Sequence, residues 1–306
     1  MATNTSPIAL FVYNRPKHTR ETVEALLKNA EAVHSDLFIF SDAAKHEGAQ
    51  SAVNEVRALI HQITGFKTIT IIEREKNWGL ANSIIDGVTA ICDKYGRAIV
   101  LEDDLIFSEH FLGYMNSALN MYEDNQLVWH ISGWNYPIEP SGLGDAFFWK
   151  TMNCWGWATW ANRWNKFSKK PDEMIRSWTP QKINAFNLDG TYNFWRQVKL
   201  NRKGKINTWA VFWYATIFSH GGLCLNPTSS YVMNVGHDGT GENCRNSDHF
   251  SMHQIINKKQ DIDLPELVSV SDDAICRIKS FLDKHARQNL AIYWLRKIQM
   301  ISETYF

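Results

Sequence analysis

The stretch that decides the fold is Ala98-Ile99-Val100-Leu101-Glu102-Asp103-Asp104-Leu105. Four apolar residues, two of them β-branched, run directly into three consecutive carboxylates. A short, continuous apolar run of this kind is typical of a strand that is buried on both faces of a parallel sheet. Because three adjacent like charges cannot stay in that interior, the strand must end where they begin.

The carboxyl end of such a strand is where open α/β sheets bind their ligands. Three acids at that position repel one another unless a cation balances them. Hard oxygen ligands suit Mg²⁺ or Mn²⁺, ions that proteins commonly share with substrate phosphates. We therefore expect Mn²⁺ or Mg²⁺ as a cofactor. The alternative is a solvated acidic loop that precedes the next helix, with Ser108 as the N-cap.

The sequence around this stretch alternates between strand and helix patterns. Apolar, β-rich runs predict strands, and apolar residues at helical spacing predict a helix after each of the first three. Strands that alternate with helices predict an α/β fold with a doubly wound, mostly parallel sheet. The expected strands are Ile8–Tyr13, Leu37–Phe40, Thr68–Ile72 and Ala98–Leu101, followed by a helix at Phe111–Met121 and a strand at Leu127–Ser132.

Composition excludes several classes of protein. A chain of 306 residues holds one large domain or two smaller ones. Its net charge of +0 favours no nucleic-acid partner. Five scattered cysteines without a C-x-x-C pair predict reduced thiols and a cytoplasmic protein. Met1–Ser6 lacks the pattern of a secretory leader, and no apolar run approaches the ~20 residues of a membrane span.

Polar residues follow the expected strands at the points where they end. Asn and Asp favour turns in any protein, so each residue has a purely structural alternative. Four such positions at one edge of a sheet favour a nucleotide site, although the chain lacks both the dinucleotide-binding and the P-loop fingerprints. The positions are Asn14 with Arg15, Asp42, Asn77, and the acids Glu102–Asp104.

The second half of the chain is rich in tryptophan. Nine of the 13 tryptophans lie between Trp149 and Trp213, among them those of Trp155-Gly156-Trp157-Ala158-Thr159-Trp160. Such side chains fill a core or stack on a ligand, and a sugar ring is a plausible partner for their flat faces. Most of these tryptophans are expected in the core, and Gly156 predicts tight backbone packing. Helices are expected at Tyr192–Leu200 and Trp209–Phe218.

Two later segments could have a function of their own, one in metal binding or proton transfer and the other in membrane binding. The loop Asn234–Gly241 is rich in glycine, and its His237 and Asp238 could ligate a metal or transfer a proton; the alternative is an Asx-stabilised loop. The tail Ile275–Ile301 is a basic amphipathic pattern. It could lie on an anionic bilayer as a peripheral membrane contact, or pack on its own domain.

These motifs together resemble a known family. The chain resembles bacterial glycosyltransferases of the GT-A fold, within or near family 2, and is distantly similar to enzymes of the N-acetylglucosaminyltransferase I type. The resemblance covers roughly residues 7 to 245. The motifs that carry it are Phe11–Pro16, Phe40–Asp42, Asn77–Leu80, Glu102–Leu105, Trp155–Trp160 and Asn234–Gly239.

The resemblance implies a nucleotide-sugar donor, expected to be a UDP-sugar, bound across the strand ends beside Asn14. Arg15 and Asp42 would contact the nucleotide, and Asn77 would lie near the diphosphate or the ribose. Asp103 would lie near the ribose or the donor sugar, and Asp104 would ligate the divalent ion. Such an ion acts as a Lewis acid on the leaving diphosphate.

The general base is the point at which the chain departs from the eukaryotic pattern. That group has an aspartate in a tryptophan-rich helix, whereas Trp209–Trp213 has no carboxylate. Inverting transfer needs a base near the acceptor hydroxyl, and Asp238 is the first candidate, followed by His237 and Asp189. Trp155 and Trp157 are expected to bind the acceptor.

The chain is expected to divide where its residue pattern changes, near Trp134, and the resemblance implies which acceptor it serves. Residues 1–133 form a nucleotide-sugar-binding half, 134–250 a tryptophan-rich acceptor-binding half of the same domain, and 251–306 a helical extension. The expected acceptor is a glycan or lipid-linked glycan of polysaccharide or lipopolysaccharide biosynthesis. The expected location is the cytoplasm, at the inner face of the membrane.

Two other functions compete with glycosyl transfer. A Mg²⁺-dependent phosphohydrolase would use a carboxylate at a strand end, Asp42 or Asp103, as its nucleophile. This function would leave the tryptophan cluster unexplained. A non-catalytic carbohydrate-binding protein would use the tryptophans alone, and would leave the polar residues at the strand ends unexplained.

Overall fold

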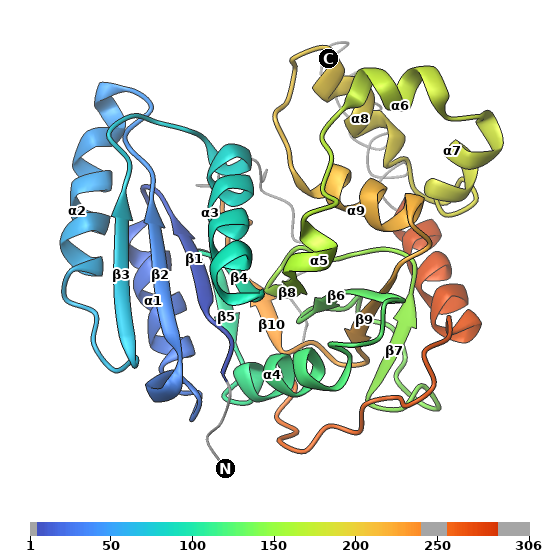
Figure 1. The fold of residues 1–306 in the computed structure, drawn as a ribbon, viewed down its shortest axis with the longest axis horizontal. Coiled ribbons are helices and arrows are strands. Elements are labelled where there is room, and N and C mark those ends of the chain that lie inside the picture. The colour runs from blue at the N-terminus through green and yellow to red at the C-terminus, as the bar shows by residue number, and fades with distance from the viewer. Residues whose placement is uncertain (1–4, 240–255, 287–306) are drawn as a thin grey trace, which may run out of the picture.

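The computed structural model describes residues 5–239 and 256–286 (Figure 1). Its centre is an eight-stranded sheet with the strand order β3-β2-β1-β4-β8-β6-β9-β7. The strands are β1 (Ile8–Val12), β2 (Asp36–Ser41), β3 (Thr68–Glu73), β4 (Arg97–Glu102), β6 (Val128–Ser132), β7 (Ala146–Trp149), β8 (Trp157–Trp160) and β9 (Leu223–Pro227). A separate pair of strands joins β5 (Leu105–Phe107) to β10 (Val232–Asn234).

Helices connect the strands and cover the sheet. The N-terminal half contains α1 (Pro16–Leu26), α2 (Gln50–Ile60), α3 (Leu80–Tyr95) and α4 (Phe111–Met121), with 3₁₀ turns at Ala32–His34 and Glu47–Ala49. The C-terminal half contains α5 (Ala161–Trp164), α6 (Pro171–Ser177), α7 (Pro180–Phe186), α8 (Trp195–Arg202) and α9 (Ala210–Ser219). A further helix runs over residues 272–286.

The N-terminal half confirms the predicted alternation of strands and helices. Strands β3, β2, β1 and β4 pair in parallel, with Ile8 between Leu37 and Ile99. β1 is buried along its whole length, as a continuous apolar run between two layers of helices must be. Because all four strands point the same way, their carboxyl ends meet at one edge of the sheet.

The C-terminal half extends the same sheet with β6, as expected, and with three strands that the sequence pattern does not predict. β8 inserts between β4 and β6 and runs antiparallel to both. β6 pairs in parallel with β9, and β7 is antiparallel to β9. Six of the eight strands therefore share one direction, so the expected α/β class with a mostly parallel sheet is confirmed. The division expected near residue 133 falls inside this one continuous sheet.

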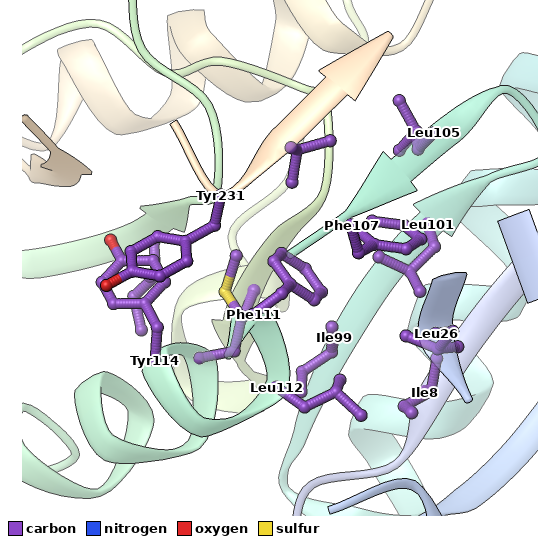
Figure 2. Close-up of a cluster of buried hydrophobic side chains, with 14 of the residues drawn as sticks. Ile8, Leu26, Ile99, Leu101, Leu105, Phe107, Phe111, Leu112, Tyr114 and Tyr231 are labelled. Carbon is purple, nitrogen blue, oxygen red and sulfur yellow. The ribbon is translucent and has the colours of Figure 1, made fainter. Parts of the chain in front are cut away.

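Two hydrophobic cores lie on either side of the sheet. The first packs α1 and α4 against β1 and β4 and continues under β5 and β10, where the rings of Tyr114 and Tyr231 stack at 5.0 Å (Figure 2). Gly156 lies against this core with φ +62°, and a Cβ there would be 3.0 Å from Val232. The main chain of Gly133 donates to the Gly156 oxygen at 2.7 Å, which confirms the tight packing expected of Trp-Gly-Trp.

The second core is aromatic and holds most of the tryptophans, as expected. The first part of the C-terminal tail packs into it, because Ala274, Ile278 and Leu282 of the helix over 272–286 are buried there. The rest of the predicted amphipathic tail, from residue 287, lies outside the described residues. No helix in the part of the chain that the structure describes is long and apolar enough to span a bilayer. The four described cysteines are free thiols.

Candidate functional site

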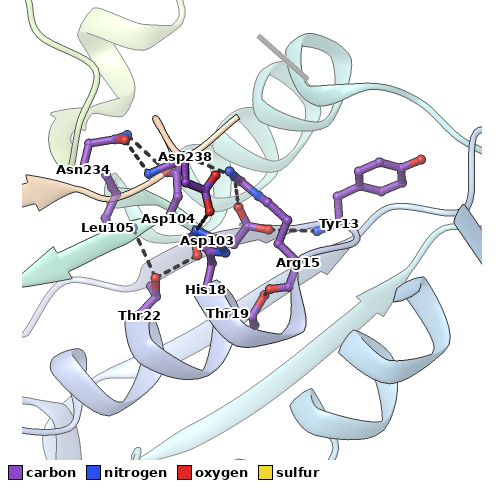
Figure 3. A network of polar contacts seen from close by, with 11 residues as sticks. Tyr13, Arg15, His18, Thr19, Thr22, Asp103, Asp104, Leu105, Asn234 and Asp238 are labelled. Carbon is purple, nitrogen blue, oxygen red and sulfur yellow. Dashed lines mark hydrogen bonds and ion pairs between the residues drawn. The ribbon is translucent and has the colours of Figure 1, made fainter. Parts of the chain in front are cut away.

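The candidate site begins where β4 ends. Asp103 and Asp104 form the turn between β4 and β5 and are only 4% and 5% exposed. Arg15 occupies the N-cap position of α1, three residues after the end of β1. β1 is the strand that pairs with β4. The parallel pairing of these two strands brings the guanidinium to the acids (Figure 3). Asn14 is half-buried beside it.

Arg15 holds both aspartates. Its Nη2 donates to Asp103 Oδ1 at 2.5 Å and to Asp104 Oδ2 at 3.0 Å, and the main-chain N–H of Tyr13 donates to Asp103 Oδ2 at 3.3 Å. Burial raises the pKa of Asp103 to about 6 in spite of the guanidinium beside it. Burial, then the charges of Asp104 and Asp103, raises the pKa of Glu102 to about 8. One guanidinium therefore does not balance three carboxylates, and the remaining charge can be balanced by a proton or by a further cation.

The loop after β10 lies over the acids. Asn234 donates from Nδ2 to Asp104 Oδ1 at 3.3 Å, and the main-chain N–H of Val235 donates to the Asp104 carbonyl at 2.9 Å. Gly236 passes so close that a Cβ would be 2.0 Å from Asp104 Oδ2. Two residues later, Asp238 Oδ2 lies 3.2 Å from His18 Nε2 on α1 (Figure 3). The antiparallel pairing of β5 and β10 is what brings this loop to the acids.

Two buried polar groups at this point have no partner among the described residues. They are Arg15 Nη1 and both ring nitrogens of His237. Buried donors and acceptors are nearly always satisfied, so these atoms are available to a ligand at the site. The ring of His237 meets Trp155 edge-on, with the ring centroids 5.5 Å apart.

Asp42 and Asn77 form a second polar cluster at the same edge of the sheet. The main-chain N–H of Asp42 donates to the Val12 carbonyl, which places it beside the end of β1. Its carboxylate accepts from the main-chain N–H groups of Ala43, Trp78 and Gly79 and from Asn77 Nδ2, all at 2.8–3.1 Å. These four donors fill its acceptor positions. Asp42 therefore fixes the loop that starts α3, and a direct contact with a nucleotide would have to replace one of them.

An aromatic cavity of about 230 Å³ adjoins the acids through Trp155. Trp155 lies on its wall and also contacts His237. None of the described side chains that line the cavity is charged. They are Trp134, Tyr136, Met152, Asn153, Cys154, Trp155, Tyr192, Phe194, Gln197, Ala210, Val211 and Tyr214.

Two of the residues proposed from the sequence are placed elsewhere. Trp157 is 1% exposed, in β8, and its ring stacks on Trp209 at 5.0 Å, so it belongs to the core and not to an acceptor surface. The reason is that β8 is an inner strand of the sheet. Asp189 is exposed in the turn after α7, where its carboxylate pairs with Lys279 at 2.5 Å. It lines a different cavity and shows no contact with the acids of the site.

Three contributors to the site, His18, Asn234 and Gly236, have no role predicted from the sequence. His18 left a signal, because it follows Arg15 by three residues and so shares a face of the helix that Pro16 begins. Asn234 and Gly236 lie in the glycine-rich loop that the sequence pattern singles out, but the pattern predicts roles only for His237 and Asp238 of that loop. Neither Asn234 nor Gly236 can be assigned without the pairing of β10 with β5.

The donor set of the site fits a divalent ion that is completed by phosphate oxygens. Within the described ranges, no group of three or more His, Cys, Asp or Glu side chains could hold a metal by itself. Mg²⁺-type ions are typically bound by one or two carboxylates together with substrate phosphates, which is what Asp103 and Asp104 can supply. The unpartnered nitrogens of His237 lie in the same loop as the residues that cover these acids.

Comparisons with known proteins give weak likenesses. No protein-family model and no curated protein matches the chain. Similar solved structures include Staphylococcus aureus TarS (12% identity, TM-score 0.30, 42% of this chain and 21% of that one) and S. aureus TarS 1–349 (7%, 0.43, 74% and 59%). A third is the mannosyltransferase PcManGT from Pyrobaculum calidifontis in complex with GDP-Man and Mn²⁺ (9%, 0.38, 71% and 69%). The chain thus spans a fifth and three fifths of the two TarS structures.

Proposed function

We propose that the chain is a glycosyltransferase of the GT-A type that transfers a sugar from a nucleoside diphosphate sugar, UDP-linked by our expectation, to a glycan or lipid-linked glycan. The observation that carries the proposal is the pair Asp103–Asp104 at the end of the central strand β4, held by Arg15 and covered by the loop after β10. An aromatic cavity adjoins this pair through Trp155, where an acceptor sugar can stack.

Each side chain of the site has a distinct role in this proposal. Asp104 would hold Mn²⁺ or Mg²⁺ together with the diphosphate of the donor, and Asp103 would lie near the ribose or the donor sugar. When bound, the ion supplies Lewis-acid stabilisation to the leaving diphosphate. Arg15 supplies a second positive charge, and its unpartnered Nη1 is available to donate to a phosphate oxygen. Asp42 keeps Asn77 and the start of α3 in place at the nucleotide end of the site.

The base that inversion requires is proposed from the same loop. Asp238, the first candidate from the sequence, faces His18 and is best suited to position the loop. His237 has two unpartnered ring nitrogens and touches Trp155 at the cavity wall, which makes it the better candidate for taking the acceptor's proton. A base must lie within hydrogen-bond reach of the acceptor hydroxyl, and the cavity lies on this side of the site.

A thermal-shift screen of nucleotide sugars tests the donor site. A ligand at 100 times its Kd adds about 2.7 kcal/mol to the free energy of unfolding. We expect a UDP-sugar with Mn²⁺ to give such a shift, and Asp104→Asn to lose the part that depends on Mn²⁺. GDP-mannose is the comparison donor. If no nucleotide sugar shifts the melting temperature while generic phosphoesters are hydrolysed, the protein is a phosphohydrolase; if a free glycan alone shifts it, the protein is a carbohydrate-binding protein.

The assignment of the base is tested with two variants of the loop. His237→Asn is expected to lower kcat at least ~100-fold while the Mn²⁺-dependent binding of the donor survives. Loss of that binding would instead make His237 a metal ligand. If Asp238→Asn abolishes turnover and His237→Asn does not, the role of base belongs to Asp238.

A further inference from the structure

The positive charge of the chain is concentrated in one helical lobe. Residues 161–208, which carry α5 to α8, contain eleven Lys and Arg but only three Asp and Glu. The net charge of this segment is +8, in a chain whose overall net charge is +0. The lobe stands beside the C-terminal half of the sheet, and α1 and α2 lie at the opposite side of the molecule (Figure 1).

Several of these cations are not neutralised within the lobe. Arg202 pairs with Asp172, and Lys170 pairs with Glu173. Six other cations are exposed and form no ion pair with any residue that the structure describes. They are Lys166, Arg176, Arg196, Lys199, Lys203 and Lys205.

Three of the six form a stripe on α8. Arg196, Lys199 and Lys203 follow one another at spacings of three and four residues, which places them on one face of the helix. An adjoining face of α8 is anchored in the core by Trp195 and Val198. Like charges at these spacings repel one another, whereas the helix dipole favours Lys199 and Lys203 at the C-terminal end of α8.

The helix that carries the stripe also borders the aromatic cavity, on a different face. Burial raises the pKa of Tyr192 on the cavity wall and the charge of Arg196 acts against that shift, so Arg196 is the member of the stripe near the cavity. Phe194 and Gln197 come from the start of the same helix and line the cavity, whose wall holds no charged side chain. A neutral sugar ring therefore suits the cavity. Negatively charged groups elsewhere on the same glycan suit the basic surface of α8. One molecule that carries both features would contact both places.

We propose that the stripe Arg196, Lys199 and Lys203 binds the anionic groups of a polyanionic acceptor glycan whose neutral acceptor sugar occupies the aromatic cavity. The identification of the cavity with the acceptor sugar rests on the proposed function; the binding of a polyanion to α8 does not. A bilayer surface fits less well, because Tyr192 is the only exposed large hydrophobic side chain of the lobe, and peripheral helices insert several.

Two matched triple variants test the proposal. Each replaces one arginine and two lysines, all exposed, with glutamine. The variants are R196Q/K199Q/K203Q on α8 and, away from the lobe, R20Q/K28Q/K258Q. Binding of fluorescently labelled inorganic polyphosphate and of polygalacturonate oligomers is measured by anisotropy at several salt concentrations, with neutral dextran oligomers and phosphatidylglycerol vesicles as comparison ligands.

We expect the wild type to bind both polyanions and to lose affinity with added salt, because exposed charges are screened. The α8 variant should bind at least ~10-fold more weakly, and the control variant within about 2-fold of the wild type. Equal binding by the two variants, binding of dextran as tight as that of the polyanions, or binding of the wild type to vesicles alone would overturn the proposal. None of these readouts requires sugar transfer, so a failure here is distinct from a failure of the proposed function.

Discussion

Replacement of Gly236 by alanine tests whether the loop after β10 must lie on Asp104 for the protein to work. The φ angle of Gly236 is one that any residue can adopt, so the added methyl group meets only a problem of space. Its Cβ would be 2.0 Å from Asp104 Oδ2 and 2.9 Å from Arg15 Nη1. Because ordinary contacts begin at 3.4 Å, the loop and the carboxylate must separate by about 1.4 Å.

Both stability and activity should respond to this shift. Overpacking costs about 1–3 kcal/mol, which a folded domain of this size survives. A misplacement of about 1 Å at a reacting centre can lower the rate ~100-fold. We therefore expect Gly236→Ala to melt a few degrees lower, to lose most of the thermal shift given by Mn²⁺ with a nucleotide sugar, and to transfer sugar ~100-fold more slowly.

The matched control is Gly48→Ala, because an added Cβ there lies 3.4 Å from the nearest atom of His46, and the φ of Gly48 is likewise not positive. The control should keep both the ligand-induced shift and the rate. If Gly236→Ala binds the donor and turns over like the wild type, the loop does not need its close contact with Asp104, and the reasoning is refuted.

Three further outcomes are expected. Trp157→Ala should cost about 3–5 kcal/mol of unfolding free energy in urea titrations, whereas Trp155→Ala should mainly raise the KM of the acceptor. Asp42→Asn should cost about 1–3 kcal/mol and raise the KM of the donor, because its new NH₂ group would face main-chain N–H groups that now donate to the carboxylate. Burial lowers the pKa of His130 to about 3. The stabilising contribution of the neutral ring is therefore complete above pH 6.5 and is lost as the pH falls, by up to ~1.4 kcal/mol of unfolding free energy per pH unit. His130→Gln should remove its share of this pH dependence, measured by urea unfolding between pH 7 and 4.

The acid sensitivity of His130 follows from its contacts as well as from burial. Its Nδ1 accepts from the indole N–H of Trp213 at 3.1 Å, and an indole N–H can only donate. Nδ1 must therefore be unprotonated, so Nε2 carries the proton that it donates to the Asn153 carbonyl at 3.0 Å. A second proton would have to bind at Nδ1, where its N–H would face the indole N–H of Trp213 in a buried site.

The N-terminal half could be predicted from the sequence because its signals are local. The strand β1 and the helix α1 each show their own pattern within a dozen residues, and parallel order follows from their alternation. The same rule is sufficient to place Arg15, Asp103 and Asp104 at one edge of the sheet, because each follows the carboxyl end of a parallel strand. The acids and the guanidinium that holds them are thus a consequence of topology.

The C-terminal half could not be predicted in the same way because its strands are short and depend on distant partners. β8 has four residues, and its register, Val100 with Trp157, joins segments nearly sixty residues apart. Without that pairing, the sequence predicts that most of the tryptophans lie in the core but not which of them lie at a binding surface. For this reason the sequence pattern assigns Trp157 to the acceptor, whereas only Trp155, two residues earlier at the cavity wall, lies beside the site.

The short pair β5–β10 is the element that joins the two halves of the site. It places Asn234 and Val235 on Asp104, and the same loop continues to His237, which touches Trp155 at the wall of the cavity. The acids and the cavity are therefore linked by about four residues of one backbone segment. A donor on one side and an acceptor on the other would have their relative position set by this loop. Any substitution that loosens the register of β10 should thus impair transfer more than it impairs the binding of either substrate alone.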